Sequence, residues 1–205
     1  MINCISDLQK YLIDLSYKFG GPREASDLIL STPGCSKEEI KELKSVFPGI
    51  PESYIKLLEA VNLNGISIGW LRVSPFSFNP EGMVANLIEG NEEGVLFSEY
   101  ASQYHLYSVA TTDGFGIFVA TASSPFKEGE IILIDESIYA DRDNPEKWIH
   151  KLAKDFEQFL IIAGNINQIH RTIKNEDERE QELSNRLKKL GIAEEYQQAW
   201  FHLFY

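Results

Sequence analysis

Two prolines fix the backbone between two amphipathic segments in the sequence VFPGIPESYIKLLEAVNLNG, residues 46–65. Pro48 cannot continue a helix through Phe47, because its ring clashes with the preceding turn and it has no amide donor. Pro51 has a preset φ that suits the first position of a new helix. We therefore expect one helix to end near Phe47, the next to begin at Pro51, and a rigid corner between them.

Helical spacing of apolar residues extends to both sides of this corner. The sequence SKEE at 36–39 predicts a capping box, in which the Ser36 hydroxyl accepts from the amide of Glu39 and the Glu39 carboxylate reaches back. An earlier helix is expected from about Ser6 to the glycines at 20–21. The three apolar stripes are Ile5, Leu8, Tyr11, Leu12, Leu15 and Phe19; then Ile40, Leu43 and Phe47; then Tyr54, Leu57, Leu58 and Val61.

The pattern changes to strands after Asn64 and Gly65, which tolerate the left-handed backbone needed to leave a helix. Residues 66–76 alternate between apolar and polar, and residues 105–137 predict three strands. Asp113 and Gly114 are expected to form a tight hairpin turn, and residues 123–129 a longer one. The fold class predicted is α+β, with an antiparallel sheet flanked by helices.

Helices are predicted to end the chain. Asn144 and Pro145 suit the start of a helix that runs to Ala163 and closes over the sheet. Residues 165–205 predict two further helices, of which the second is rich in aromatic residues. Its cluster has two interpretations: it packs back onto the domain, which is favoured, or it forms an exposed surface that binds a partner. The cluster is Tyr196, Trp200, Phe201, Phe204 and Tyr205.

Charge is the one extreme of the composition. The net charge is −12, and between Val73 and Asp143 twelve acidic residues accompany only Lys127 and Arg142 as basic ones. Such a negative field repels nucleic acid and anionic lipid, and it accelerates association with a basic protein. The alternative is that these acids only make the surface soluble. We expect a protein partner, with no nucleic acid and no membrane.

The remaining composition indicates an ordinary soluble domain. With 43% apolar residues the 205-residue chain can bury a core. Cys4 and Cys35 are the only cysteines and have no spacing typical of a metal site or a disulfide framework. No segment resembles a signal peptide or a membrane span. We expect a cytoplasmic protein without cofactor or metal, and the sequence leaves its oligomeric state open.

Catalytic motifs are weak in this chain. The sequence GISIG at 65–69 matches the nucleophile elbow of esterases at Ser67, but a helix precedes it and strand-like sequence follows, which is the reverse of what the elbow requires. The four histidines are far apart, and the loop at 141–146 lacks the ligands of a calcium site. The sequence DGFG at 113–116 is better explained as a hairpin than as a phosphate loop. No catalytic residue is predicted.

Several motifs in a fixed order resemble the SUKH superfamily, also called the Smi/Knr domain. They are the segment 38–65, the hairpin TTDGFGIFVA, the strand GEIILIDES and the sequence DFEQFL. The matching positions are Ile40, Leu43, Ile50, Pro51, Tyr54, Leu57, Leu58, Asn64, Gly65, Asp113, Gly114, Gly116, Phe156, Phe159 and Leu160. The resemblance covers residues 1–163 as one domain, and residues 164–205 would be a C-terminal helical hairpin extension outside the pattern.

The resemblance implies a binding protein without catalytic activity. Bacterial members resemble immunity proteins that neutralise toxins, often nucleases or deaminases, and fungal members resemble regulators of cell-wall glucan synthesis. Together with the charge, this favours an immunity protein that binds a basic toxin domain, with a regulatory scaffold as the alternative. The expected partner-binding residues are Glu89, Glu92, Glu93, Glu99, Asp113, Glu128, Asp135, Glu136 and Trp200.

Overall fold

The structure, a computed structural model, describes residues 1–76 and 78–204. Within these residues the α-helices are α1 (Ile5–Ser16), α2 (Lys37–Val46), α3 (Glu52–Ala60), α4 (Met83–Glu89), α5 (Ser98–Gln103), α6 (Phe156–Thr172), α7 (Glu176–Lys189) and α8 (Glu194–Phe204). The strands are β1 (Ser67–Ile68), β2 (Leu71–Arg72), β3 (Leu106–Thr112), β4 (Phe115–Ala120), β5 (Ile131–Asp135) and β6 (Ile149–Ala153). The predicted α+β class is confirmed.

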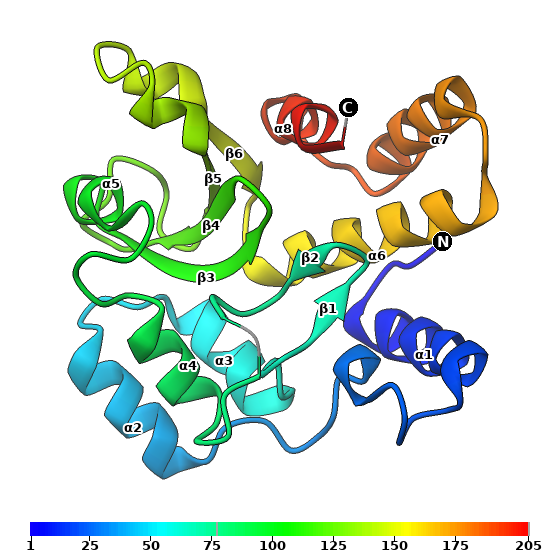
Figure 1. The fold of residues 1–205 in the computed structure, drawn as a ribbon, viewed down its shortest axis with the longest axis horizontal. Coiled ribbons are helices and arrows are strands. Elements are labelled where there is room, and N and C mark those ends of the chain that lie inside the picture. The colour runs from blue at the N-terminus through cyan, green and yellow to red at the C-terminus, as the bar shows by residue number, and fades with distance from the viewer. Residues whose placement is uncertain (77, 205) are drawn as a thin grey trace.

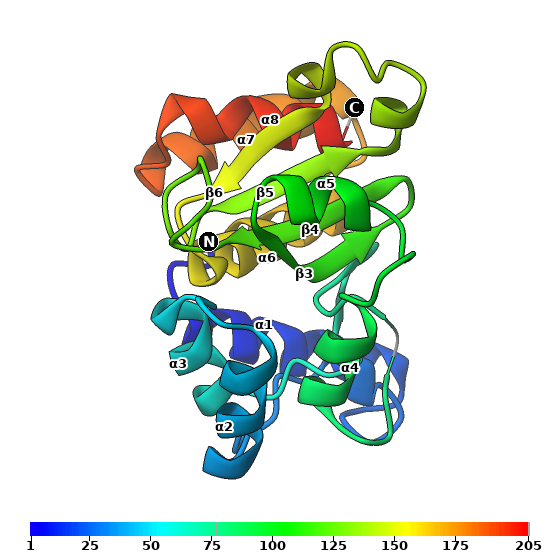
Figure 2. The same ribbon diagram turned by 90° about the vertical axis from the view of Figure 1, so that its left-hand side faces the viewer.

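All these strands form one antiparallel sheet in the order β1-β2-β3-β4-β5-β6, so each strand pairs with its neighbour in sequence. Helices cover both faces: α5 lies on one, and α6 and α8 lie on the other (Figures 1 and 2). Alternate residues of β5 therefore enter different cores. Ile131 and Leu133 join the main core, whereas Ile132 and Ile134 pack with α5. This explains why β5 is a continuous apolar run, since neither face of it is exposed.

Local signals in the sequence correctly predicted several turns and caps. The capping box is present, with Ser36 N donating to Glu39 Oε2 at 2.7 Å and Glu39 N donating to Ser36 Oγ at 3.2 Å. The β3–β4 turn falls at Asp113 and Gly114, and Gly114 has a φ of 76°. These features depend on residues that are close in sequence, which is why the pattern sufficed.

The proline corner differs from the prediction by one residue. α2 ends at Val46 and α3 begins at Glu52, so Pro51 is the residue before the helix and not its first helical position. Its φ of −63° and ψ of 136° are the extended backbone of an N-cap. A left-handed backbone was expected at Asn64 or Gly65, after α3. Gly65 has this conformation, with a φ of 75°.

The single helix predicted from Asn144 to Ala163 is wrong. The chain forms a short 3-10 helix at Pro145–Trp148, then β6, and α6 begins only at Phe156. The apolar positions in 148–152 fit helical spacing, but pairing with β5 determines the outcome. Asp155 is the true N-cap, because its Oδ1 accepts from Gln158 N at 2.8 Å.

α6 continues through Gly164, so the expected boundary between residues 163 and 164 lies inside this helix. The side chains of Ile2 and Leu8 lie close to Gly164. A Cβ there would lie 2.5 Å from Leu8 Cδ1 and 3.0 Å from Ile2 Cδ1. α1 therefore packs beside the middle of α6, as Figure 1 shows.

The favoured prediction that the aromatic C-terminal helix packs back onto the domain is confirmed for its described residues. Trp200 is fully buried, its Nε1 donates to Leu152 O at 2.8 Å, and its ring stacks on Phe159 with centroids 5.6 Å apart. Tyr196 is also buried. Tyr205 and the side chain of Phe204 lie outside the described residues.

Candidate functional site: an acidic groove between α2 and α4

The structure separates the predicted partner-binding residues into four places. Glu89, Glu92, Glu93 and Glu99 are exposed on α4, α5 and the loop between them; Asp113, Asp135 and Glu136 lie where the β3–β4 turn meets the end of β5; Glu128 is on the β4–β5 turn; and Trp200 is in the core. Trp200 is therefore a wrong prediction for a contact residue, because the folded domain covers its side chain completely.

Two of these glutamates line a groove of about 370 Å³ between α2 and α4. The two helices lie side by side in Figure 1. Glu39 and Glu42 come from α2, Glu81 precedes α4, and Glu89 and Glu92 come from the end of α4 and beyond. Between them lie Val84, Ala85 and Ile88, an apolar floor, with Asn79 as the other polar residue. We call this hollow the acidic groove.

The folding of α2 places its acids at the groove. Ile40 and Leu43 are buried, so Glu39 and Glu42, each one position earlier, lie at the border between the buried and the solvent-facing side of the helix. Glu39 is held by the capping box, since its carboxylate accepts from Ser36 N. One wall of the groove thus contains a carboxylate fixed by the start of its own helix.

A network of asparagines holds the opposite wall. The buried Asn86 of α4 accepts from Phe76 N at 3.0 Å and donates to Asn64 Oδ1 at 3.2 Å. Asn79 donates from Nδ2 to Glu89 Oε2 at 3.2 Å and accepts from Glu81 N at 2.9 Å. These bonds order the approach to α4 and position the carboxylate of Glu89.

A smaller, apolar hollow of about 210 Å³ lies on the other side of the α4–α5 loop. Leu106 and Phe118 of the sheet contribute to its lining, and Leu96, which is 58% exposed, lies at its edge. Asn91 ties the loop to β3, because Ser108 N donates to its Oδ1 at 2.7 Å and its Nδ2 donates to Ser108 O at 3.0 Å. A charged hollow and an apolar one therefore share one fixed loop.

Glu39, Glu42 and Glu81 belong to the acidic groove but were missed by sequence reasoning. α2 and α4 are separated by more than thirty residues, and their contact is created only by the tertiary fold. The signal that could have found the first two is their spacing of three residues, which places both on one edge of an amphipathic helix.

Asp135 does not belong to an exposed surface. Only 6% of it is accessible, Oδ1 accepts from Ser137 N at 2.8 Å, and Oδ2 lies 2.9 Å from His202 Nε2. Burial acts to raise the pKa of Asp135, but the hydrogen bonds from Ser137 and His202 outweigh it and the pKa is lowered. Asp135 is therefore a contact between the sheet and α8, and its prediction as a partner contact does not fit this position.

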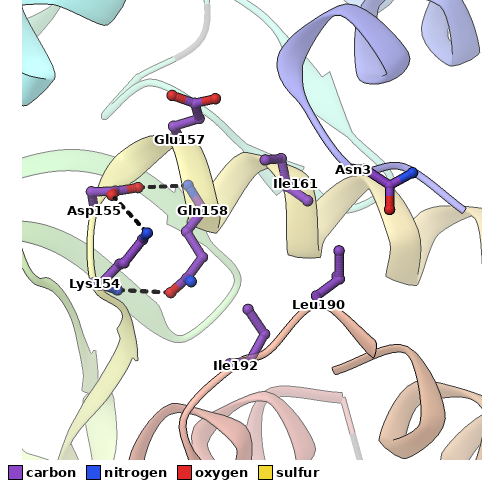
Figure 3. A pocket seen from close by; sticks show the side chains of 8 residues that line it. All are labelled: Asn3, Lys154, Asp155, Glu157, Gln158, Ile161, Leu190 and Ile192. Carbon is purple, nitrogen blue, oxygen red and sulfur yellow. Dashed lines mark hydrogen bonds and ion pairs between the residues drawn. The ribbon is translucent and has the colours of Figure 1, made fainter. Parts of the chain in front are cut away.

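Another hollow, of about 300 Å³, lies between the start of α6 and the α7–α8 loop (Figure 3). Three of its polar residues pair with one another: Asp155 caps α6 through Gln158 N, Gln158 Oε1 accepts from Lys154 N at 3.0 Å, and Lys154 Nζ lies 3.9 Å from Asp155 Oδ2. Because Asp155 already occupies the helix N-terminus, this hollow offers a weaker binding surface than the acidic groove.

The geometry does not support the esterase nucleophile or a metal site. Ser67 lies in β1 and pairs with Arg72 of β2, so the segment is strand–turn–strand and lacks the elbow's strand-to-helix turn. Within residues 1–76 and 78–204, no group of three or more His, Cys, Asp or Glu side chains is arranged to hold a metal ion. None of the described helices combines the length and apolarity that crossing a membrane requires.

Comparison with known proteins adds no family. No family model matches this chain, and neither the curated proteins nor the solved structures contain a match.

Proposed function

We propose that this protein is a non-enzymatic binding module that covers another protein through the acidic groove and the adjoining α4–α5 loop. The observation that carries the proposal is the groove itself, where five glutamates surround an apolar floor. Lysine and arginine side chains combine an aliphatic stem with a charged head, so they complement both parts of such a surface. The neighbouring apolar hollow beside Leu96 supplies a place for an uncharged anchor of the same partner.

Within this class, an immunity protein of the SUKH type that neutralises a basic toxin domain, acting in the cytoplasm, is the function we favour. Its support is the sequence resemblance together with the charge, since nucleic-acid-cleaving toxins need basic surfaces and opposite charge accelerates capture. The alternative is a regulatory scaffold in which the C-terminal aromatic residues mediate assembly. Two of these residues are not exposed for such contacts. Tyr196 and Trp200 are buried against the protein's own sheet and helices.

The test is capture of the partner from the native host with the full-length protein, followed by mass identification. The groove variant Glu89→Lys/Glu92→Lys is compared with a control of equal charge, Glu59→Lys/Glu180→Lys, whose exposed sites lie on α3 and α7. We expect the wild type and the control to retain a basic protein and the groove variant to lose it.

Equal retention by all three proteins would contradict binding through the groove. Loss from both variants would show that only the total charge matters. A captured protein without toxin domains or inhibitable activity would contradict the immunity function and leave the groove as a binding surface of another kind.

A further inference from the structure

Three titratable side chains meet where the last turn of α8 lies on the sheet. His202 of α8 contacts Asp135 at the end of β5, with 2.9 Å between Nε2 and Oδ2. His150 of β6 lies against the His202 ring, with centroids 4.9 Å apart. Phe115 of β4 meets His202 edge to face at 6.0 Å. His202 therefore contacts both the carboxylate of Asp135 and the second imidazole.

The hydrogen bonds of this cluster are unequally distributed. Asp135 uses one oxygen for Ser137 N and the other for His202. His150 Nε2 is buried and has no hydrogen-bond partner among the described residues. The one carboxylate of the cluster is already in contact with Ser137 N and His202. A positive charge on His150 would be partly buried and without a hydrogen-bond acceptor at Nε2.

The other charged groups on the packed elements lie elsewhere. At the opposite end of α8, Glu195 pairs with Lys151 of β6 at 3.0 Å, and the Tyr196 hydroxyl donates to the buried Glu130 at 2.7 Å. Glu136 follows Asp135 and lies beside the β3–β4 turn, where it is exposed. α8 is thus fixed at its start by Tyr196 and Lys151 and in its middle by the buried Trp200. The histidine cluster lies at its last turn, beside the buried Leu203.

The titration behaviour agrees with this geometry. Burial, and then the charge of His202, lower the pKa of His150, while Asp135 acts weakly in the other direction. Folded His150 therefore binds a proton less readily than an unfolded chain does. The stability that it contributes is present above the unfolded histidine pKa of about 6.5 and is lost as the pH falls below it.

We propose that Asp135, His150 and His202 form an acid-sensitive latch for the end of α8. The contact between His202 and Asp135 holds the last turn on the sheet, and a proton on His150 releases that turn. The rest of α8 stays attached through Tyr196 and the buried Trp200, so only the last turn opens.

The test is hydrogen exchange of the full-length protein between pH 7 and pH 4.5, corrected for the intrinsic exchange rate. Uptake of one proton on opening raises the opening constant by up to tenfold per pH unit. We expect this rise for amides 201–203 below about pH 6, and no comparable rise for amides 194–196 or for that of Trp200. His150→Phe should abolish it, whereas His170→Phe, at a histidine on the far end of α6, should retain it.

Nuclear magnetic resonance of the wild-type imidazoles gives a second measurement that needs no variant. We expect His150 to bind its proton below the ordinary histidine pKa of about 6.5, with the amide shifts of 201–203 following His150. The latch is refuted if exchange at 201–203 is independent of pH, if His150→Phe behaves as the wild type does, or if the amide shifts of 201–203 do not follow the protonation of His150.

Discussion

Carboxylates serve opposite purposes on two sides of this molecule. In the acidic groove, Glu89 and Glu92 are exposed and lie beside the apolar side chains of Ala85 and Ile88. On the α8 side, Glu130 and Asp135 are buried, and each bonds to a residue of that helix. The same residue types are therefore exposed at the proposed binding surface in one region and assemble the fold in the other. Their burial and hydrogen bonds, which depend on tertiary contacts, decide between the two.

The largest loss of stability should come from removing the side chain of Trp200, which anchors α8 in the core. Trp200→Ala leaves a void between Leu152 and Phe159 and should lower the free energy of unfolding by about 3–5 kcal/mol. Chemical denaturation of the variant and the wild type measures it. Leu96→Ala is the matched control, because Leu96 is 58% exposed and should change stability by less than about 0.5 kcal/mol. Equal effects would mean that α8 is not part of the core.

A smaller loss of stability is expected from removing the buried carboxylate of Glu130. Glu130 is 0% exposed and accepts from the Tyr196 hydroxyl at 2.7 Å and from Lys127 N at 3.0 Å, with Lys151 Nζ 3.4 Å away. Glu130→Ala removes this acceptor from the Tyr196 hydroxyl and Lys127 N, whereas Lys151 keeps its pair with Glu195 at 3.0 Å. Because Lys151 is one-third exposed and can be hydrated, we expect a loss of about 2–3 kcal/mol, below the full cost of breaking a buried pair.

The control for this variant is the double-mutant cycle with Tyr196→Phe. The two changes should be less than additive if the hydroxyl and the carboxylate stabilise the fold through their mutual bond. Strict additivity would mean that Glu130 acts through Lys151 and Lys127 alone.

The smallest effect on stability should come from the groove. Glu89→Lys/Glu92→Lys changes two exposed side chains, so the free energy of unfolding should stay within about 0.5 kcal/mol of the wild type. A denaturation midpoint and slope equal to those of the wild type would confirm it. A loss as large as that of Glu130→Ala would show that these glutamates support the fold, and the comparison between the two regions would fail.

Local signals in the sequence were sufficient for features made by neighbouring residues. The capping box at Ser36, the Asp113-Gly114 turn and the α+β class were predicted because each depends on short-range pattern. β6 was missed, because Ile149 and Leu152 fit a helical stripe equally well and only pairing with β5, a distant segment, makes them a strand.

The residues of the candidate site also divide into those that the sequence indicates and those that only tertiary contacts bring together. Glu89 and Glu92 could be selected from their position in the most acidic stretch of the chain. Glu39 and Glu42 were not selected. Their spacing places them on one edge of α2, but α2 meets α4 only in the folded protein. Asp135 and Trp200 were wrongly predicted to lie on the binding surface. Composition identifies an acid or an aromatic residue, whereas burial by α8 and the core is a property of the three-dimensional packing.

The central claim is that the acidic groove captures a basic protein by charge. The most direct measurement is the association rate constant of the captured partner, determined at rising salt concentration for the wild type, the groove variant Glu89→Lys/Glu92→Lys and the control Glu59→Lys/Glu180→Lys. We expect the rate for the wild type and the control to fall by at least tenfold as salt screens the attraction, and the groove variant to associate slowly at every concentration. Rates that are independent of salt and equal for the three proteins would contradict the claim.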